Sequence, residues 1–375
     1  MSYWLVSLPW LDNADRTWTL LQNKVWYENQ FAQNYRFKLP NLKVGTLDSL
    51  MVLSDDLVKV NGAVEAVVNK IRRQLFDMQA SGNSGDREEV TVEGLPPDEF
   101  LERFTWNEAK YPPRRPLKET VNTITETVQK LEDDLKTRMS EYNQLKGQMG
   151  ALMRKQGGNL AVRDLGEFVK KQDVVSTENL TTVFAVVSKY SKAEWLKCYE
   201  TLVEYVVPRS AKQVAEDNEY AVFRVFLFRR VVDQFKHEAR QRGYQVRDYE
   251  FSEERQNSQD QSSQALKHDA EEKRSQLEQW SSTAYGEAFS AWIHICAIRL
   301  FTESILRYGV PPEFLTALVK PNAKTTTKLR KLLASMFASE SAKEFFDGDA
   351  GANAAVAGAE TEMHPYVSFT ISIET

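Results

Sequence analysis

The stretch PLKETVNTITETVQKLEDDLKTRMSEYNQLKGQMGALMRKQ, residues 116–156, decides the fold. Its apolar residues recur at alternating steps of four and three, the spacing that lines one side of a helix. They are Leu117, Val121, Ile124, Val128, Leu131, Leu135, Met139, Tyr142, Leu145, Met149 and Leu152. No proline follows Pro116, so the pattern predicts one helix on the order of 60 Å long, whose narrow apolar seam needs a partner helix.

The predicted partner lies in residues 252–285 of the same chain. Ser252 to Gln279 is strongly polar but contains neither glycine nor proline, and it joins the apolar segment from Trp280 to Tyr308. A helix can therefore continue unbroken to Gly309 and the prolines after it. We expect it to return antiparallel to the first long helix, as in a helical hairpin.

Shorter elements flank this helix pair. Alternating apolar residues predict strands at 2–9, 35–39, 181–188, 220–228, 244–251, 314–319 and 366–373. Helical periodicity predicts helices at 18–25, 46–78, 97–104, 160–169, 191–204, 231–239 and 324–337. Neither end of the chain has enough strands for a sheet by itself, so the terminal strands are expected to share one.

Three sequence signals mark helix boundaries. Ser191 with Glu194 has the spacing of a capping box, which opens a helix. Gly157-Gly158 and Gly243 are expected to end helices, because glycine accepts the left-handed backbone conformation that often closes them. Gly157-Gly158 lacks the strand and helix order of a phosphate-binding loop, so a helix end is the favoured interpretation.

These elements predict a helix-rich α+β protein shaped as an elongated dumbbell. It has a discontinuous α/β foot, a long antiparallel helical neck and a small α/β head. The predicted parts are residues 1–115 for the N-terminal part of the foot, 116–157 for neck helix 1, 158–251 for the head, 252–280 for neck helix 2 and 281–375 for the C-terminal part of the foot. The Gly/Ala-rich segment 348–360 is expected to be mobile.

Composition and charge narrow the class of protein. The chain has 375 residues, 42% of them hydrophobic and 27% charged, which is typical of a globular protein. A formal charge of −5 argues against a dedicated nucleic-acid binder. Residues 1–9 predict a strand rather than a signal peptide, and 288–306 is interrupted by charged residues, which favours a buried helix over a membrane span. The expected location is cytoplasmic.

No motif of a known catalytic or cofactor site occurs in the chain. Walker A, GxGxxG, HExxH and GxSxG patterns are absent, so we predict no enzyme, no catalytic residue and no cofactor. Cys198 and Cys296 lie far apart, and the histidines lack metal-ligand spacing, so neither a disulfide framework nor a metal site is predicted; the histidines are His237, His268, His294 and His364. His294, among apolar neighbours, is expected to be a core residue rather than a general base.

Three further groups of residues have a structural and a functional interpretation. The acidic run Glu132-Asp133-Asp134 is expected to be a solvated helix face rather than a catalytic pair. The basic face of Lys324, Lys328, Arg330 and Lys331 suits an acidic partner or a plain exposed helix. The aromatic residues of the strand at 220–228 are expected to pack rather than to bind; they are Tyr220, Phe223, Phe226 and Phe228.

Several strings resemble the C-subunit family of the V-type proton-translocating ATPase (V-ATPase), in order and over nearly the whole chain. They are FKLPNLKVGTLD at 37–48, LTTV at 180–183, YETL at 199–202, VVP at 206–208, RDYEFSEE at 247–254, ESILRYGVPP at 303–312 and HPYV at 364–367. The sequence departs from the family pattern mainly in the polar stretch 256–264 and in the Gly/Ala-rich segment 348–358.

The resemblance implies a non-catalytic stator component in the cytosolic V1 sector of the pump. In the family the head holds a peripheral stalk, a heterodimer of the E and G subunits. The foot meets a second stalk and the cytosolic N-terminal domain of the membrane a-subunit. Release of the family member accompanies reversible disassembly, and some members bind actin or nucleotide. The family implies a cytoplasmic protein, peripheral on the cytosolic face of vacuolar membranes when assembled, with no nucleic-acid partner and only indirect membrane contact.

The sequence leaves two functional hypotheses from different classes of protein. The first is the stator linker, whose interface residues the sequence does not identify. The alternative is a cytoskeletal or trafficking adaptor, in which the neck is a spacer and the basic helix near Lys324 to Lys331 binds actin or acidic membrane.

Overall fold

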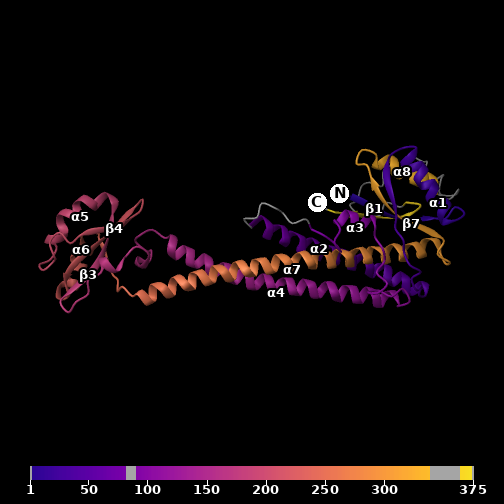
Figure 1. The fold of residues 1–375 in the computed structure, drawn as a ribbon. Helices are drawn as coiled ribbons and strands as arrows, with labels where there is room; N and C mark the ends of the chain where they lie inside the picture. The colour runs from indigo at the N-terminus through magenta and orange to yellow at the C-terminus, as the bar shows by residue number, and fades with distance from the viewer. Residues whose placement is uncertain (1, 82–89, 338–363, 374–375) are drawn as a thin grey trace. The chain divides into compact units, whose positions relative to one another are not determined.

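The computed structural model describes residues 2–81, 90–337 and 364–373 (Figure 1). Contacts divide the chain into two compact units. Unit 1 comprises Met1–Arg138 and Gln276–Thr375, and unit 2 comprises Met139–Ser275. The segment predicted to be mobile, 348–360, lies outside the described residues. The dumbbell shape and the five-part division of the chain stay predictions.

Three long helices dominate the chain, as the periodicity predicts. They are α2 (Leu47–Ser81), α4 (Leu117–Gly157) and α7 (Glu253–Tyr308). The seam of α4 is confirmed, because each of its eleven apolar positions is buried or half-buried. Both α4 and α7 continue through the boundary at which the chain divides into units.

Within unit 1, helix α4 contacts two helices rather than the single expected partner. Arg138 of α4 lies over the ring of Trp280 of α7, with its guanidinium carbon 5.1 Å from the ring centroid. Glu132 of α4 pairs with Lys70 of α2 at 2.9 Å. The expectation that Glu132 is merely solvated is therefore wrong, since it joins two helices.

Helix α2 also packs against α7 in unit 1. Asn61 of α2 accepts hydrogen bonds from the indole of Trp292 at 3.1 Å and from the thiol of Cys296 at 3.2 Å. Ser54, seven residues earlier on α2, donates to Glu303, seven residues after Cys296 on α7. The two helices therefore run antiparallel, which buries the apolar face of α2.

The terminal strands of unit 1 form one antiparallel sheet, as expected. Its order is β2 (Ala32–Arg36), β7 (Phe314–Pro321), β1 (Ser2–Pro9) and β8 (Val367–Ser372). Helix α1 (Ala14–Leu21), the π-helical turn η1 (Gln22–Tyr27) and α8 (Thr326–Phe337) supply the apolar side chains that pack on one face. That core contains Trp4, Val6, Leu8, Leu21, Val25, Ala317, Val319, Leu329 and Leu333.

A polar network ties the sheet of unit 1 to the short helix α3 (Pro97–Glu102). Glu102 accepts hydrogen bonds from the Tyr3 hydroxyl at 3.0 Å and from the Lys320 ammonium at 2.8 Å. Burial by itself would raise the pKa of Glu102, but the hydrogen bonds from Lys320 and Tyr3 outweigh it and lower that pKa. The carboxylate therefore stays charged and connects α3 to β1 and β7.

Unit 2 has its own antiparallel sheet, with a core on each face. The order is β4 (Lys212–Glu216), β5 (Tyr220–Phe228), β3 (Leu180–Ser188) and β6 (Gln245–Asp248). Helices α5 (Lys192–Cys198) and α6 (Val232–Gln241) cover one face with Trp195 and Phe235. Leu160 and Leu165 help to cover the other face, against Phe184 and Val222.

Several local predictions need correction. Strand β2 lies earlier than predicted, strand β4 was not predicted, and the helix expected at 160–169 is reduced to the 3-10 turn η2 (Leu165–Glu167). Ser191 makes no capping hydrogen bond, because a 3-10 turn precedes α5 and leaves its backbone non-extended. Helix α4 ends at Gly157, but neither Gly157 nor Gly158 is left-handed, whereas Gly243 is, with φ +81°.

All strand pairs in the two sheets are antiparallel, so the α/β description of the foot and head is corrected to α+β for both sheets. Antiparallel neighbours need no helical crossover between them. The overall prediction of a helix-rich mixed protein is confirmed.

Candidate functional site

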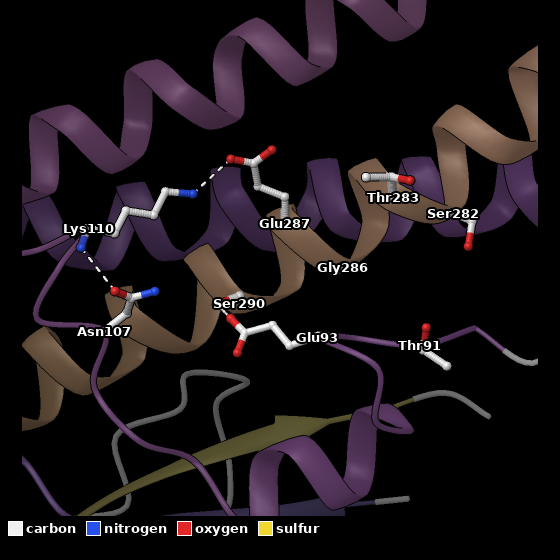
Figure 2. Close-up of a pocket in the computed structure, with 9 residues that line it drawn as sticks. All are labelled: Thr91, Glu93, Asn107, Lys110, Ser282, Thr283, Gly286, Glu287 and Ser290. Carbon is white, nitrogen blue, oxygen red and sulfur yellow. Dashed lines mark hydrogen bonds and ion pairs between the residues drawn. The ribbon is translucent and has the colours of Figure 1, made fainter.

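A polar pocket of about 380 Å³ lies in unit 1 beside α7 (Figure 2). Three segments line it: the turn after residue 90, the loop before α4 and the middle of α7. The lining residues are Thr91, Glu93, Asn107, Lys110, Ser282, Thr283, Gly286, Glu287 and Ser290. Apart from the acidic and basic side chains, the walls are hydroxyls, an amide and backbone, so the pocket is polar.

A tight turn brings the first segment to the helix. Val92 and Leu95 exchange backbone hydrogen bonds of 2.7 and 3.0 Å, and the residues between them, Glu93 and Gly94, have φ of 52° and 83°. Two successive left-handed residues are typical of a type I′ turn. Glu93 accepts a hydrogen bond of 3.3 Å from Ser290 of α7, as Figure 2 shows.

Lys110 and Glu287 neutralise each other, whereas Glu93 adds a second carboxylate to the pocket. Lys110 donates to Glu287 at 2.7 Å, and both side chains are about two-fifths exposed, at 40% and 41%. Burial would lower the pKa of Lys110, but the hydrogen bond to Glu287 and the electrostatic interactions with Tyr111 and Glu287 together outweigh it and raise that pKa. An exposed pair of this kind contributes roughly 0–1 kcal/mol. The pair fixes the loop on the helix without supplying a proton donor or acceptor for chemistry.

Gly286 allows the turn to approach α7 closely. A Cβ at this position would lie 3.0 Å from the carbonyl oxygen of Thr91 and 3.5 Å from the Cα of Val92. Contact with backbone cannot be relieved by rotating a side chain. Glycine at 286 is therefore a packing requirement of the pocket wall.

We expect Gly286→Ala to lower the free energy of unfolding by about 1 kcal/mol, because the backbone clash exceeds the gain in helix propensity. Gly62→Ala on α2 is the matched control, since nothing lies within 4 Å of an added Cβ there. That control is expected to raise stability by about 0.5–1 kcal/mol. Urea unfolding of both variants measures the difference, and equal stabilisation of the two would contradict the close approach.

His294 lies close to the pocket and is a core residue, as predicted. It is 1% exposed, and the rings of Phe104, Trp106 and Tyr111 surround it at centroid distances of 4.8–5.0 Å. Its Nδ1 lies 2.7 Å from the carbonyl oxygen of Ser290, and its Nε2 accepts from the backbone N–H of Asn107 at 3.1 Å. Both ring nitrogens are satisfied in the neutral form, with the proton assigned to Nδ1.

Burial lowers the pKa of His294 to about 4, from an ordinary value near 6.5. The unfolded chain therefore binds a proton at a higher pH than the folded chain does. Above pH 6.5 the imidazole is neutral in both states, and the free energy of unfolding is at its full value. As the pH falls from 6.5 towards 4, the unfolded chain takes up the proton before the folded chain does, and the free energy of unfolding falls. From pH 7 to pH 5 the loss amounts to about 2 kcal/mol.

Between pH 7 and pH 5 the free energy of unfolding of the natural chain is expected to fall by about 2 kcal/mol more than that of the His294→Gln variant. The variant is also expected to be less stable than the natural chain at pH 7. Urea unfolding at the two pH values measures this difference, and His237→Gln, at an exposed site on α6, is the control. An unchanged slope in His294→Gln would contradict the neutral buried state.

The other residues singled out in the sequence do not converge on this pocket. Among the described residues, no three His, Cys, Asp or Glu side chains are grouped closely enough to hold a metal ion. His237 and His268 are exposed, and Cys198 and Cys296 are free. Burial raises the pKa of Cys296 to about 12, so its thiol stays protonated.

The basic face of α8 is narrower than predicted. Lys324 lies in the turn before α8, because the helix begins at Thr326 and not at the predicted residue 324. Lys324, Lys328 and Lys331 are exposed, whereas Arg330 turns inward, with its guanidinium carbon 4.5 Å from the centroid of the Trp4 ring. Arg330 also contacts the Nε2 of His364. On β5, Phe223 is buried and Tyr220, Phe226 and Phe228 are half-buried, which agrees with packing in unit 2.

A second, wider cavity of about 940 Å³ lies before α4, lined by Pro40, Asn41, Leu42, Lys43, Glu108, Pro112, Pro113 and Arg114. No Ser, Thr, Cys or His lines the second cavity, and in the first the Ser290 hydroxyl meets the Glu93 carboxylate only at 3.3 Å. Sequence reasoning missed both cavities, because their walls come from segments that lie apart in the chain and carry no shared motif.

One described helical segment, Gln261–Tyr308 of α7, is long and apolar enough to pass as a membrane span by length and composition. However, 78% of its most apolar window is buried inside the protein, and the core helix of a soluble protein passes the same test. Its burial agrees with the prediction of a core helix at 288–306.

Comparison with known proteins gives a consistent result. A family model for the V-ATPase C-subunit matches residues 3–367. The C-subunit of the V-type proton ATPase of Arabidopsis thaliana is 50% identical, covering 99% of this chain and 99% of that protein. The C-subunit from Hordeum vulgare is 47% identical, covering 82% of this chain and 88% of that protein. A C-subunit from Danio rerio is 38% identical, covering 99% of this chain and 98% of that protein. None of these relatives favours the adaptor hypothesis.

A solved structure of the cytoplasmic N-terminal domain of the V-ATPase I-subunit, a homolog of the a-subunit, covers 89% of this chain and 97% of its own. It is 11% identical with a TM-score of 0.25. A likeness of that size carries no argument about fold or partners.

Proposed function

The chain belongs to the C-subunit family of V-ATPase, a non-catalytic component of a proton-transporting complex, and on that premise we propose that it is a stator linker. In this proposal residues 158–251 form a head that holds one stalk heterodimer of the E and G subunits. Residues 1–115 and 281–375 form a foot that meets a second such stalk and the N-terminal domain of the membrane a-subunit.

The observation that carries the proposal is the presence of two compact units, each with its own sheet and core. The apolar clusters on the two faces of the unit 2 sheet come from residues 160–249, and the sheet of unit 1 uses both ends of the chain. Two separately folded units give one chain two surfaces for partners. Attachment at two points raises retention through effective concentration, while each contact remains individually breakable.

Reversible release follows from the same proposal. If the two contacts differ in strength, loss of the weaker one removes the gain from double attachment and lowers the retention of the chain. We propose α4 and α7 as the spacer between the binding ends. In support, Lys273 of α7 pairs with Glu141 of α4 at 2.8 Å within unit 2, and Arg138 stacks on Trp280 within unit 1.

The proposed location is the cytoplasm, with the protein peripheral on the cytosolic face of vacuolar membranes when it is assembled. Membrane contact is then indirect, through the other components of the pump.

Isothermal titration of the full chain with purified E–G heterodimer tests the proposal. Two binding sites are expected, one tight and one weak, and adding the N-terminal domain of the a-subunit should strengthen the weaker one. The Gly62→Ala variant, altered only on an open helix face, serves as a control that should bind as the natural chain does. Absence of heat and of co-elution on size exclusion would refute the stator assignment.

A further inference from the structure

Tyr205 of unit 2 is half-exposed and has a left-handed backbone conformation, which residues other than glycine rarely adopt. Tyr205 lies in the loop between the 3-10 turn η5 (Tyr199–Thr201) and β4, with φ of 68°. Its carbonyl oxygen accepts from the N–H of Phe228 at 3.2 Å, and Val207 donates to the carbonyl oxygen of Phe226 at 2.9 Å. The loop is therefore fixed to the end of β5, and the tyrosine is held in a defined position.

The ring of Tyr205 forms a small platform with two neighbours. The guanidinium carbon of Arg230 lies 3.7 Å from the ring centroid, and the ring of Phe228 lies 6.0 Å away at 72°. Tyr205 is nevertheless 50% exposed, and Arg230 is exposed. We call Tyr205, Phe228 and Arg230 the Tyr205 platform.

The left-handed backbone at Tyr205 is held by the hydrogen bonds of its loop to β5 and not by full burial of its side chain. A bulky residue in the left-handed region costs folding free energy that glycine would avoid. Half of its surface remains in water, so burial in a core does not offset that cost. Strained residues held by their surroundings occur preferentially at functional sites. The observed outlier therefore points to a role for the ring outside unit 2.

Two arginines at the platform, Arg230 and its neighbour Arg229, have no carboxylate partner among the described residues. Arg230 stacks on rings, and Arg229 donates to the carbonyl oxygen of Thr177 at 2.9 Å and to the hydroxyl of Ser176 at 2.7 Å. Over the part of the chain that the structure describes, neither guanidinium pairs with a carboxylate. Tyrosine, phenylalanine and arginine are also the residues enriched at the centres of protein interfaces.

We propose that the Tyr205 platform is the docking site in unit 2 for an acidic protein segment that also presents apolar side chains. A guanidinium whose carbon lies over a ring can still offer its N–H groups for two hydrogen bonds to one carboxylate. The half-exposed ring of Tyr205 then contacts the apolar neighbours of that carboxylate. The inference rests on the proposed function, in which the segment belongs to the E–G stalk.

A protein is the better match than a membrane or a nucleic acid. Those polyanions are bound by faces with many cations, whereas the platform and its neighbour supply two arginines in a chain of formal charge −5. Aromatic rings beside a single stacked guanidinium suit a segment of mixed acidic and apolar character.

Titration calorimetry of the full chain with purified E–G heterodimer tests the site. Arg230→Glu is expected to weaken the tight interaction at least tenfold. Tyr205→Gly is expected to weaken it at least tenfold while its melting temperature stays equal to or above that of the natural chain, because glycine relieves the left-handed strain. Loss of affinity without loss of stability separates a binding role from a structural one.

Two variants control for ring loss and for strain relief. Tyr190→Ala removes a tyrosine of unit 2 that is 96% exposed, and Arg209→Gly relieves a second left-handed residue, φ 56°, in the same loop. Both are expected to bind within twofold of the natural chain.

Three outcomes would overturn the inference. If the natural chain binds the heterodimer and Arg230→Glu and Tyr205→Gly bind equally well, the site is wrong while the proposed function stands. If the natural chain does not bind, both fall together. If the two variants keep full stalk affinity but lose binding to vesicles rich in phosphatidylserine or to single-stranded DNA, the platform serves a different class of partner.

Discussion

Trp195→Ala is expected to lower the free energy of unfolding of unit 2 by about 3–5 kcal/mol, the cost of emptying a large buried aromatic site. Trp195 is fully buried, and its ring centroid lies 4.9 Å from that of Tyr244 and 6.3 Å from that of Phe235. Its indole N–H has no hydrogen-bond partner among the described residues, so the loss is one of packing. A change of this size is a large share of the stability of a small domain.

Scanning calorimetry with near-ultraviolet circular dichroism measures this effect. We expect the transition that belongs to unit 2 to move to lower temperature while that of unit 1 stays in place. Tyr190→Ala is the control, because an exposed side chain usually contributes within about 0.5 kcal/mol. A single transition that shifts as a whole would contradict two separately stable units.

The same variant separates the two proposed binding ends. At a temperature between the two transitions, Trp195→Ala should lose the tight stalk interaction and keep the interactions assigned to unit 1. Titration with the E–G heterodimer and with the N-terminal domain of the a-subunit tests this. Simultaneous loss of both interactions would argue against two binding ends.

Val128→Pro is expected to break α4 in its middle, at a cost of about 3 kcal/mol or more. Proline removes the hydrogen bond to the carbonyl oxygen of Ile124 and places its ring against that turn. Val128 is also buried in unit 1, so its packing is lost as well. Because we propose α4 as the spacer, assembly of the pump should weaken while unit 2 remains folded.

Val128→Ala is the matched control, since it removes two methyl groups and leaves the helix intact. Its cost is expected to be about 2 kcal/mol, and assembly should stay close to normal. Co-purification of the pump components measures assembly, and circular dichroism measures folding. Normal assembly of the Val128→Pro variant would mean that a continuous α4 is not the spacer.

The long helices and most strands follow from the sequence because their signals are local. The seam of α4 recurs along one segment, and no helix breaker interrupts α7 from Ser252 to Gln279, where the chain is most polar. The same holds for His294, whose apolar neighbours in sequence already favour burial.

Local sequence patterns predicted neither strand β4 nor the backbone conformation of Tyr205. Lys212–Glu216 has neither alternation nor β-branched enrichment, and pairing with β5 alone makes it a strand. Tyr205 carries no sign of a left-handed backbone, because its conformation is imposed by hydrogen bonds to β5, more than twenty residues later in the chain.

The sequence by itself determined the long helices, the shared terminal sheet and the absence of any known catalytic motif, since each depends on spacing along the chain. Only the tertiary structure decided which charges meet and which remain free. It paired Glu132 with Lys70, turned Arg330 onto Trp4 and left Arg230 on the exposed ring of Tyr205. The reason is that charge pairing and side-chain stacking depend on distances between segments, which periodicity within one segment does not contain.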